Sequence, residues 1–263
     1  MIRDENTLLE ARVRDLVAKA EKGEPVFTDF LSPGEVRAVG SMARAASREV
    51  SCFFFGGYAE AERQRGFFLP EYIESPERFS DIAQFFDGEP VVSLLISGSG
   101  YRRLSHRDYL GSLLGLGLER SVLGDIVFTD SENEEAILFC DGVIASFLES
   151  ELQKIANDKV RVSRICVAED FVPKRSFAHI SDTVASPRLD CVVAAVCSLS
   201  REKASAAIRG GLCELEYETA EQPDRAVSAP AVLSVRGYGK FRINSLSERT
   251  RKGRLRLDAD KYI

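Results

Sequence analysis

The sequence lacks several features that would assign it quickly to a class of protein. No apolar run approaches the roughly 20 residues that a helix needs to span a bilayer. The first five residues, Met1 to Glu5, are polar and acidic, which is atypical of a secretory signal or a transit peptide. We therefore expect a globular protein with a cytoplasmic location.

Residues that serve metal and redox chemistry are few and widely spaced. Histidine occurs twice, as His106 and His179. No two cysteines have the spacing of a metal knuckle or a redox pair, and we expect buried, reduced thiols. The six cysteines are Cys52, Cys140, Cys166, Cys191, Cys197 and Cys213. We expect neither a metal nor a cofactor.

The glycine-rich stretches do not complete a phosphate-binding motif. Ser97-Gly98-Ser99-Gly100 follows an expected strand, and Gly115-Leu116-Gly117 lies in or after an expected helix. Neither has the full pattern of a dinucleotide fingerprint or a P-loop. We interpret both as turn glycines.

Charge is present, and it is distributed unevenly along the chain. The whole sequence has a net charge of −6, but residues 181–263 hold 14 basic and 11 acidic residues. Residues 236–256 contain eight basic residues and a single acid, Glu248. The positive potential is therefore local to the C-terminal third, which is where we expect an anionic partner to bind.

The first 80 residues are expected to form a small α/β module. Helical and strand periodicity predicts two amphipathic helices and two strands, at 5–22, 33–48, 51–55 and 66–69. Ser32-Pro33 supplies an N-cap and a first-turn proline for the second helix. We expect the aromatic runs Phe53 to Phe55 and Phe67-Phe68 to form strand core rather than a base-stacking platform.

Residues 81–170 predict a β-α-β-β-α-β order, which is that of a ferredoxin-like (RRM-like) domain. The expected elements are 91–96, 106–118, 122–129, 136–140, 142–156 and 160–168. RNA-recognition domains share this order, but these strands lack their glycine- and aromatic-rich stacking signature. RNA contact by this domain is left open. Residues 171–183 are expected to be a linker.

Residues 184–263 predict two short helices with basic residues in their first turns. Ser186 and Ser200 stand at the expected N-caps, and Arg188, Arg201 and Lys203 follow them. A helix N-terminus offers unpaired N–H groups and partial positive charge, which together favour phosphate. We expect the two helix starts to lie side by side and to bind a nucleic-acid backbone.

A strand over 232–241 is expected to complete this surface. Arg236, Lys240 and Arg242 alternate along it and should share one face. We predict that these cations converge with the helix starts into one cationic cradle for RNA, although a solvated basic surface is the alternative. The predicted RNA-binding residues are Arg188, Ser200, Arg201, Lys203, Arg209, Arg236, Tyr238, Lys240, Arg242, Arg249, Arg251, Lys252 and Arg254, with His106 and Arg107 as a secondary contact.

Two resemblances support this interpretation. Residues 186–241 resemble the S-four type (αL) RNA-binding domain, through Arg188-Leu189-Asp190, Ser200-Arg201, Gly211 and Ser234-Val235-Arg236-Gly237. Most of the chain is similar to the YlmH family. Its marks are Gly66 to Pro70, His106 to Gly111, Leu116 to Arg120, Gly124 to Ile126 and Arg249 to Arg254.

The YlmH resemblance implies a non-enzymatic RNA-binding protein associated with the ribosome. It would engage rRNA or tRNA, and in particular the large subunit and peptidyl-tRNA during quality control of stalled translation. The stretches Glu214 to Glu218 and Ser228 to Ala231 depart from the family pattern. The acids of the first should weaken the attraction of phosphate.

Other functions are weighed against this one. Arg188-Leu189-Asp190 is similar to the catalytic tripeptide of RNA pseudouridine synthases, but only 73 residues follow Asp190. We therefore expect Asp190 to cap its helix or pair with an arginine. His106 and Asp108 could form a catalytic pair, but no nucleophile stands out. An RNA-modifying enzyme and an RNA-linked assembly factor for a membrane or photosystem complex stay open as alternatives.

Overall fold

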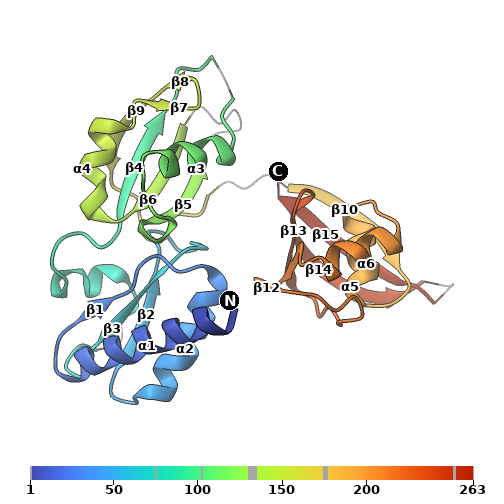
Figure 1. The fold of residues 1–263 in the computed structure, drawn as a ribbon, viewed down its shortest axis with the longest axis horizontal. Helices are drawn as coiled ribbons and strands as arrows, with labels where there is room; N and C mark the ends of the chain where they lie inside the picture. The colour runs from blue at the N-terminus through green and yellow to red at the C-terminus, as the bar shows by residue number, and fades with distance from the viewer. Residues whose placement is uncertain are drawn as a thin grey trace. The chain divides into compact units, whose positions relative to one another are not determined.

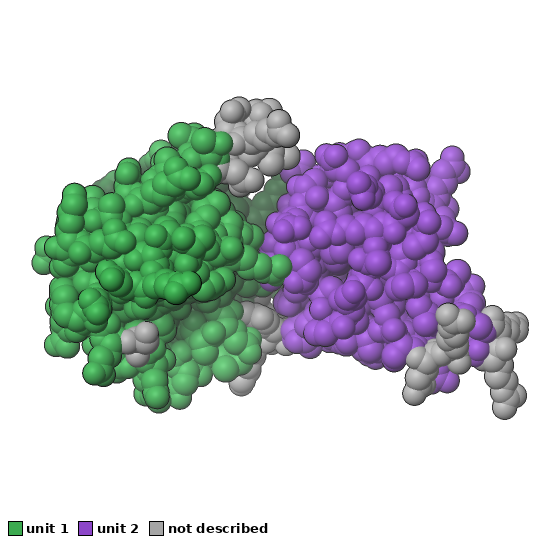
Figure 2. Space-filling model, turned by 90° about the horizontal axis from the view of Figure 1, so that it is seen from below, with its two compact units in different colours: residues 1–174 green, residues 175–263 purple. Residues whose placement is uncertain are grey.

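The computed structural model describes residues 2–74, 76–101, 103–129, 135–173, 177–250 and 253–262, without the side chains of 2–6, 248 and 249. The chain divides into two compact units, residues 1–174 and residues 175–263 (Figure 2). Unit 1 contains several sheets and unit 2 contains a six-stranded sheet, and each unit has hydrophobic core of its own. The fold class is α+β, as the sequence predicts.

The first part of unit 1 packs two helices on a small sheet (Figure 1). Helices α1 (Ile2–Glu21) and α2 (Pro33–Ala46) lie over the antiparallel strands β1 (Val26–Phe27), β3 (Arg65–Leu69) and β2 (Ser51–Phe55). Ser32 caps α2 as predicted, in a capping box with Glu35. The sequence did not predict the two-residue strand β1.

Aromatic residues form the core of this small sheet rather than an open platform. Phe67 and Phe68 are fully buried on opposite faces, Phe68 under the helices. Phe54 packs on the helix side, while Phe53 and Phe55 pack with Phe67 on the other side. The expectation of a strand core is confirmed.

The second part of unit 1 has the predicted β-α-β-β-α-β order. Its antiparallel sheet has the strand order β5-β6-β4-β9, in which the split βαβ units interleave. The elements are β4 (Val92–Ser97), α3 (His106–Gly115), β5 (Leu123–Phe128), β6 (Glu135–Cys140), α4 (Gly142–Glu151) and β9 (Arg161–Ile165). Both helices cover one face of this sheet, where Tyr109, Leu113 and Leu148 are buried.

Both helices of this part end earlier than the sequence predicted. Helix α3 stops at Gly115, and Gly117 adopts a φ of +83°, a conformation that favours glycine. Helix α4 stops at Glu151 because the next residues form a hairpin of β7 (Lys154–Ile155) and β8 (Asp158–Lys159). The helical periodicity of the sequence continues past the ends of both helices, so it did not predict where either helix ends.

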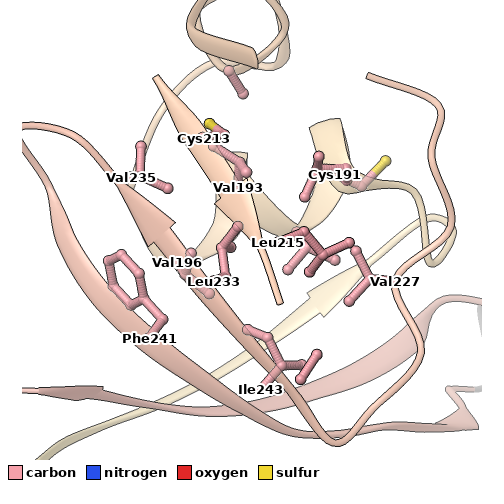
Figure 3. Close-up of a cluster of buried hydrophobic side chains, with 14 of the residues drawn as sticks. Cys191, Val193, Val196, Cys213, Leu215, Val227, Leu233, Val235, Phe241 and Ile243 are labelled. Carbon is pink, nitrogen blue, oxygen red and sulfur yellow. The ribbon is translucent and has the colours of Figure 1, made fainter. Parts of the chain in front are cut away.

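Unit 2 is a six-stranded antiparallel sheet covered on one face by two helices. The strand order is β10 (Phe177–Val184), β15 (Leu255–Tyr262), β14 (Gly239–Arg249), β13 (Ala231–Val235), β11 (Cys213–Leu215) and β12 (Glu218–Thr219). The helices α5 (Leu189–Val196) and α6 (Arg201–Arg209) share a core with the sheet. Figure 3 shows Val193 and Val196 of α5 near Leu233, Phe241 and Ile243 of the sheet.

Two predicted elements of this region were wrong. Residues 177–183 of the expected linker belong to β10, which pairs with β15 along its whole length. Its mostly polar side chains hid the strand from a search for apolar alternation. The single strand expected over 232–241 is a hairpin of β13 and β14, with Gly237 at a φ of +87° in the turn.

The cysteines are free throughout, but their burial varies. Cys140, Cys191 and Cys213 are buried, and Cys52 and Cys197 are half-buried. Cys166 is exposed, contrary to the expectation of buried thiols. Within the described ranges no helix is long and apolar enough to cross a membrane.

Candidate nucleic-acid interface

One buried carboxylate joins the starts of α5 and α6. Arg188 donates from Nε and Nη2 to the two oxygens of Asp190, at 3.2 and 3.1 Å. Arg201 donates from Nη2 to Asp190 Oδ2 at 2.8 Å. The Asp190 side chain is 5% exposed, whereas those of Arg188 and Arg201 are 44% and 59% exposed. The expected pairing of Asp190 with an arginine is confirmed, and two arginines share it.

The charge of Asp190 is stable at physiological pH. Burial alone would raise its pKa, but the hydrogen bonds from Arg188 and Arg201 prevail and lower the pKa to about 2. The carboxylate therefore stays ionised and holds both guanidinium groups. A carboxylate that is buried and engaged by two arginines is poorly placed to act as the nucleophile of a pseudouridine synthase.

The two helix starts differ in what they offer a phosphate. At α6, Ser200 is the N-cap and its Oγ accepts from the Lys203 amide at 3.3 Å, while Arg201 and Lys203 are exposed. At α5 the predicted cap is wrong, because the N-cap is Arg188 and not Ser186. The amides of Leu189 and Asp190 donate to carbonyls of Arg225 and Pro223. The first-turn amides of α5 are therefore occupied, and its contribution is the Arg188 side chain.

Replacing Ser200 by alanine should weaken the start of α6. The loss of an N-cap hydroxyl lowers the free energy of unfolding by about 1 kcal/mol. Urea unfolding followed by circular dichroism would measure it. Ser205, in the middle of the same helix, offers a matched control, and Ser205→Ala should cost less because alanine is the better helix former.

Basic residues also gather at the far end of α6. Arg209 is the last residue of the helix, and Arg236 lies in the β13–β14 turn, where its amide donates to Leu212 O at 2.8 Å. Both side chains are exposed, and Tyr238 in the same turn is 40% exposed. A nine-residue helix is about 13 Å long, so this second group lies a helix length from Arg201.

Lys240 and Arg242 lie on the opposite face of the sheet. Their neighbours Phe241 and Ile243 are buried against the helices, and alternation turns Lys240 and Arg242 the other way. Arg236 follows β13 in the turn before β14, so it does not lie on the strand that carries them. The prediction that all these cations converge into one cradle is therefore wrong.

The outer face of the sheet has its own charge balance. Lys240 Nζ lies over the rings of Tyr217 and Tyr262, at 5.0 and 5.3 Å. Arg242 lies over the ring of Phe177 and donates to Asp260 at 3.0 Å. These cations are engaged by rings and a carboxylate, which leaves this face less suited to phosphate than the helix starts.

Acidic groups reinforce that difference between the faces. Asn244, Arg242 and His179 contact Asp260 and lower its pKa to about 2, so this carboxylate stays charged. Glu214 pairs with Ser234, next to Lys240, and alternates with the buried Cys213 and Leu215. The first of the acids expected beside the groove therefore points to the outer face, away from α5 and α6.

Of the remaining predicted residues in unit 2, the structure describes the side chain of Arg254 but not those of the other three. Arg254 donates to Thr183 O at 2.5 Å and is thereby tied to the β10 backbone. The side chain of Arg249 and all of Arg251 and Lys252 lie outside the described residues. Within the described residues, no group of three or more His, Cys, Asp or Glu side chains could hold a metal ion.

The secondary contact, His106 and Arg107, lies in the first turn of α3 in unit 1. Ser105 caps this helix and Asp108 completes the capping box, which confirms Asp108 as a first-turn acid. Removal from water, followed by the nearby Arg120 charge, lowers the pKa of His106. The lowered pKa favours the neutral form of His106, so Arg107 is the cation of this turn.

One exposed residue beside this turn was not predicted from the sequence. Tyr101, in the loop between β4 and α3, is 96% exposed, and Arg103 beside it is also exposed. The signal was present in the run Tyr101-Arg102-Arg103, which places an aromatic residue next to two cations. It was missed because aromatic residues that stack on bases were expected within strands.

Comparisons with known proteins agree with the sequence resemblance. A family model described as "YlmH, N-terminal" matches residues 8–73, and one described as "Putative RNA-binding domain in YlmH" matches residues 96–169. The chain is 30% identical over 238 residues to "Ribosome-associated protein quality control protein P2" of Bacillus subtilis (strain 168), covering 89% of this chain and 86% of the relative. The chain belongs to the YlmH family. Both YlmH models match within unit 1, and the S-four type resemblance of residues 186–241 stays a prediction.

A solved structure from the same family also shares similarity with this chain. It is "Cell division protein ylmH from Streptococcus pneumoniae", with a TM-score of 0.49 and 19% identity. The match covers 61% of this chain and 91% of that structure.

Proposed function

We propose that this YlmH-family protein binds structured RNA on the ribosome, without catalysis, through the helix-start surface of unit 2. We define this surface as Arg188, Ser200, Arg201 and Lys203. The observation that carries the proposal is the shared carboxylate of Asp190, which holds two arginines side by side with their guanidinium groups partly exposed. Arginine is suited to phosphate because its planar fork can donate two parallel hydrogen bonds.

The chemistry of the surface favours backbone contact over base reading. Arg188 and Arg201 are fixed, Lys203 adds a further exposed charge, and the capped start of α6 adds the positive end of a helix dipole. Contacts of this kind set affinity, orientation and salt dependence rather than sequence preference. A rigid RNA such as rRNA or tRNA, whose phosphates have a fixed spacing, is the ligand that such a surface fits.

The family supplies the context of this binding. The Bacillus subtilis relative is named a ribosome-associated quality control protein. We propose that the present chain likewise associates with the ribosome, and that its ligands there are the large subunit and the peptidyl-tRNA of stalled translation.

Charge reversal at Arg201 and Lys203 together tests the proposal. The double variant Arg201→Glu, Lys203→Glu should leave the ribosomal fractions in sucrose-gradient cosedimentation, because two attractive interactions with phosphate become repulsive. Removal of each phosphate interaction should also lower the slope of log affinity against log salt by roughly 0.7 to 0.9.

The outer face of the same sheet supplies a matched control. Lys240→Glu, Arg242→Glu makes the same change in net charge on the face that the helices do not cover. This control should retain most of the cosedimentation. An equal decrease for both variants would show that net charge matters and the helix-start surface does not, and unchanged binding of a folded Arg201, Lys203 variant would end the proposal.

A further inference from the structure

The sheet face that RNA-recognition domains use is closed in unit 1. On the face away from α3 and α4, Phe139 is fully buried beneath Tyr58, with ring centroids 4.9 Å apart. Val127, Ile137 and Ala61 are buried with them, and Phe171 packs against Tyr58 at 6.0 Å. A segment of the first part of the unit therefore occupies the place where bases would stack.

Hydrogen bonds fix this cover in place. Tyr58 donates to Asp125 at 2.8 Å, and the same carboxylate accepts from the amides of Glu62 and Arg63. The Arg63 side chain donates to the carbonyls of Phe30, Arg120 and Leu123 at 2.8 to 2.9 Å. These hydrogen bonds make the covering segment a fixed part of the folded unit.

The rest of the sheet offers no stacking platform among its described residues. Phe128, the other phenylalanine of the four strands, packs against Tyr109 of α3 at 5.5 Å. On the open part of the outer face, Ser97 donates to Glu135, and Arg161 is exposed. An RNA contact by this domain must use another surface.

The loop between β4 and α3 presents such a surface. Its base is tied to the hairpin β7–β8, since the amide and hydroxyl of Ser99 both bond to the buried Asp158. Leu104 anchors its other end and is fully buried. Between these anchors Tyr101 is 96% exposed, and Arg103 is exposed beside it. The fold therefore holds an aromatic ring in water on a short loop that is anchored at both ends.

Charge continues from this loop into α3. Arg107 is exposed in the first turn, and the neighbouring acid Asp108 is engaged by the amide and hydroxyl of Ser105. An exposed tyrosine with cations nearby suits single-stranded RNA, because bases stack on aromatic rings while phosphates pair with arginine.

We infer that the described residues of the loop between β4 and α3 and of the first turn of α3, which carry Tyr101, Arg103 and Arg107 and are here called the Tyr101 loop, form the RNA-contacting surface of this domain, in place of its sheet. An unpaired base stacks on Tyr101, and Arg103 and Arg107 bind the flanking phosphates. This inference rests on the proposed function, since it supposes that the protein binds RNA, but it concerns a different unit from the helix-start surface.

The test compares two kinds of variant in the full chain, with fluorescently labelled, unfractionated tRNA as the probe. Tyr101→Ala should weaken binding by about 5- to 150-fold, as expected for the loss of one stacked base, with an unchanged salt slope. Arg103→Gln, Arg107→Gln should lower the slope of log affinity against log salt by about 1.4 to 1.8. Anisotropy titrations at several salt concentrations give both quantities.

Two residues elsewhere in unit 1 serve as matched controls. Tyr72 is 63% exposed in the first part of the unit, and Arg161 is exposed on the sheet. Tyr72→Ala and Arg161→Gln should leave tRNA binding unchanged. If Arg161→Gln weakens binding more than the Arg103, Arg107 variant, the sheet face is the contact and the inference is wrong.

The outcomes separate this inference from the proposed function. If Arg201→Glu, Lys203→Glu abolishes tRNA and ribosome binding while the Tyr101 loop variants bind normally, the inference alone fails. If neither set changes binding, the proposed function fails as well. If Tyr101→Ala releases the protein from ribosomes but leaves the binding of naked tRNA and of protein-free rRNA intact, the loop contacts a protein, which also overturns the inference.

Discussion

Replacing Arg65 by alanine is expected to lower the free energy of unfolding of unit 1 by about 3–5 kcal/mol. Arg65 is 1% exposed and forms an ion pair with Asp141, the N-cap residue of α4. Its guanidinium also lies over the rings of Phe27 and Phe30, at 5.0 and 4.8 Å. Alanine would remove the charge partner of Asp141 and leave a cavity between the two parts of the unit.

A second substitution at Arg65 separates the two causes. Arg65→Met keeps most of the volume and removes a buried cation whose Nε and Nη1 find no hydrogen-bond acceptor. Asp141 would keep its cap bond to the Val143 amide and some access to water. We therefore expect methionine to cost much less than alanine. Urea unfolding by circular dichroism, with hydrogen exchange of unit 1 peptides to assign the transition, would measure both. A decrease below about 1 kcal/mol for alanine would contradict this account.

Much of the fold was accessible to sequence reasoning because its elements have strong periodicity. The β-α-β-β-α-β order of unit 1 and the capping of α2 by Ser32 follow from local patterns. Strand β10 was missed because its outer face is polar and its pairing with β15 joins residues about 80 positions apart. A local pattern carries no information on such a partner.

The site illustrates the same division between local and distant information. Alternation correctly placed Lys240 and Arg242 on one face of a strand, but it could not say which face the helices would cover. The pairing of Asp190 with a nearby arginine was predicted from a tripeptide. The second partner, Arg201, lies eleven positions further on and depended on the packing of α5 and α6.

The covering of the sheet face in unit 1 could not be predicted from the sequence, for a related reason. The segment that covers Phe139 comes from residues 58–61, far earlier in the chain. The motifs around Arg120 and Asp125 gain a physical role from this packing, since both contact the covering segment. The sequence showed that the strands lack aromatic residues for stacking, but it did not show that another segment covers the sheet face.

Replacing Asp190 by asparagine should weaken both the stability of unit 2 and its affinity for RNA. Asparagine has a similar shape but cannot neutralise Arg188 and Arg201, so their side chains would repel and move apart. Allowing for the exposure of both arginines, the free energy of unfolding at pH 7 should fall by about 1–2 kcal/mol. RNA affinity should fall as well, because the two arginines would no longer be held in one geometry.

The pH dependence of the stability reports on the charge of the Asp190 carboxylate. Its pKa is lowered to about 2 in the folded chain, against roughly 3.9 when unfolded. Its contribution is therefore complete above pH 4 and is lost as the pH falls toward 2. The difference in stability between wild type and Asp190→Asn should shrink across that interval. Asp182→Asn, at an exposed aspartate of β10, removes the same negative charge elsewhere in the unit and is the matched control. A gap between wild type and Asp190→Asn that stays constant from pH 5 to pH 2 would show that the carboxylate does not hold the two helix starts through its charge.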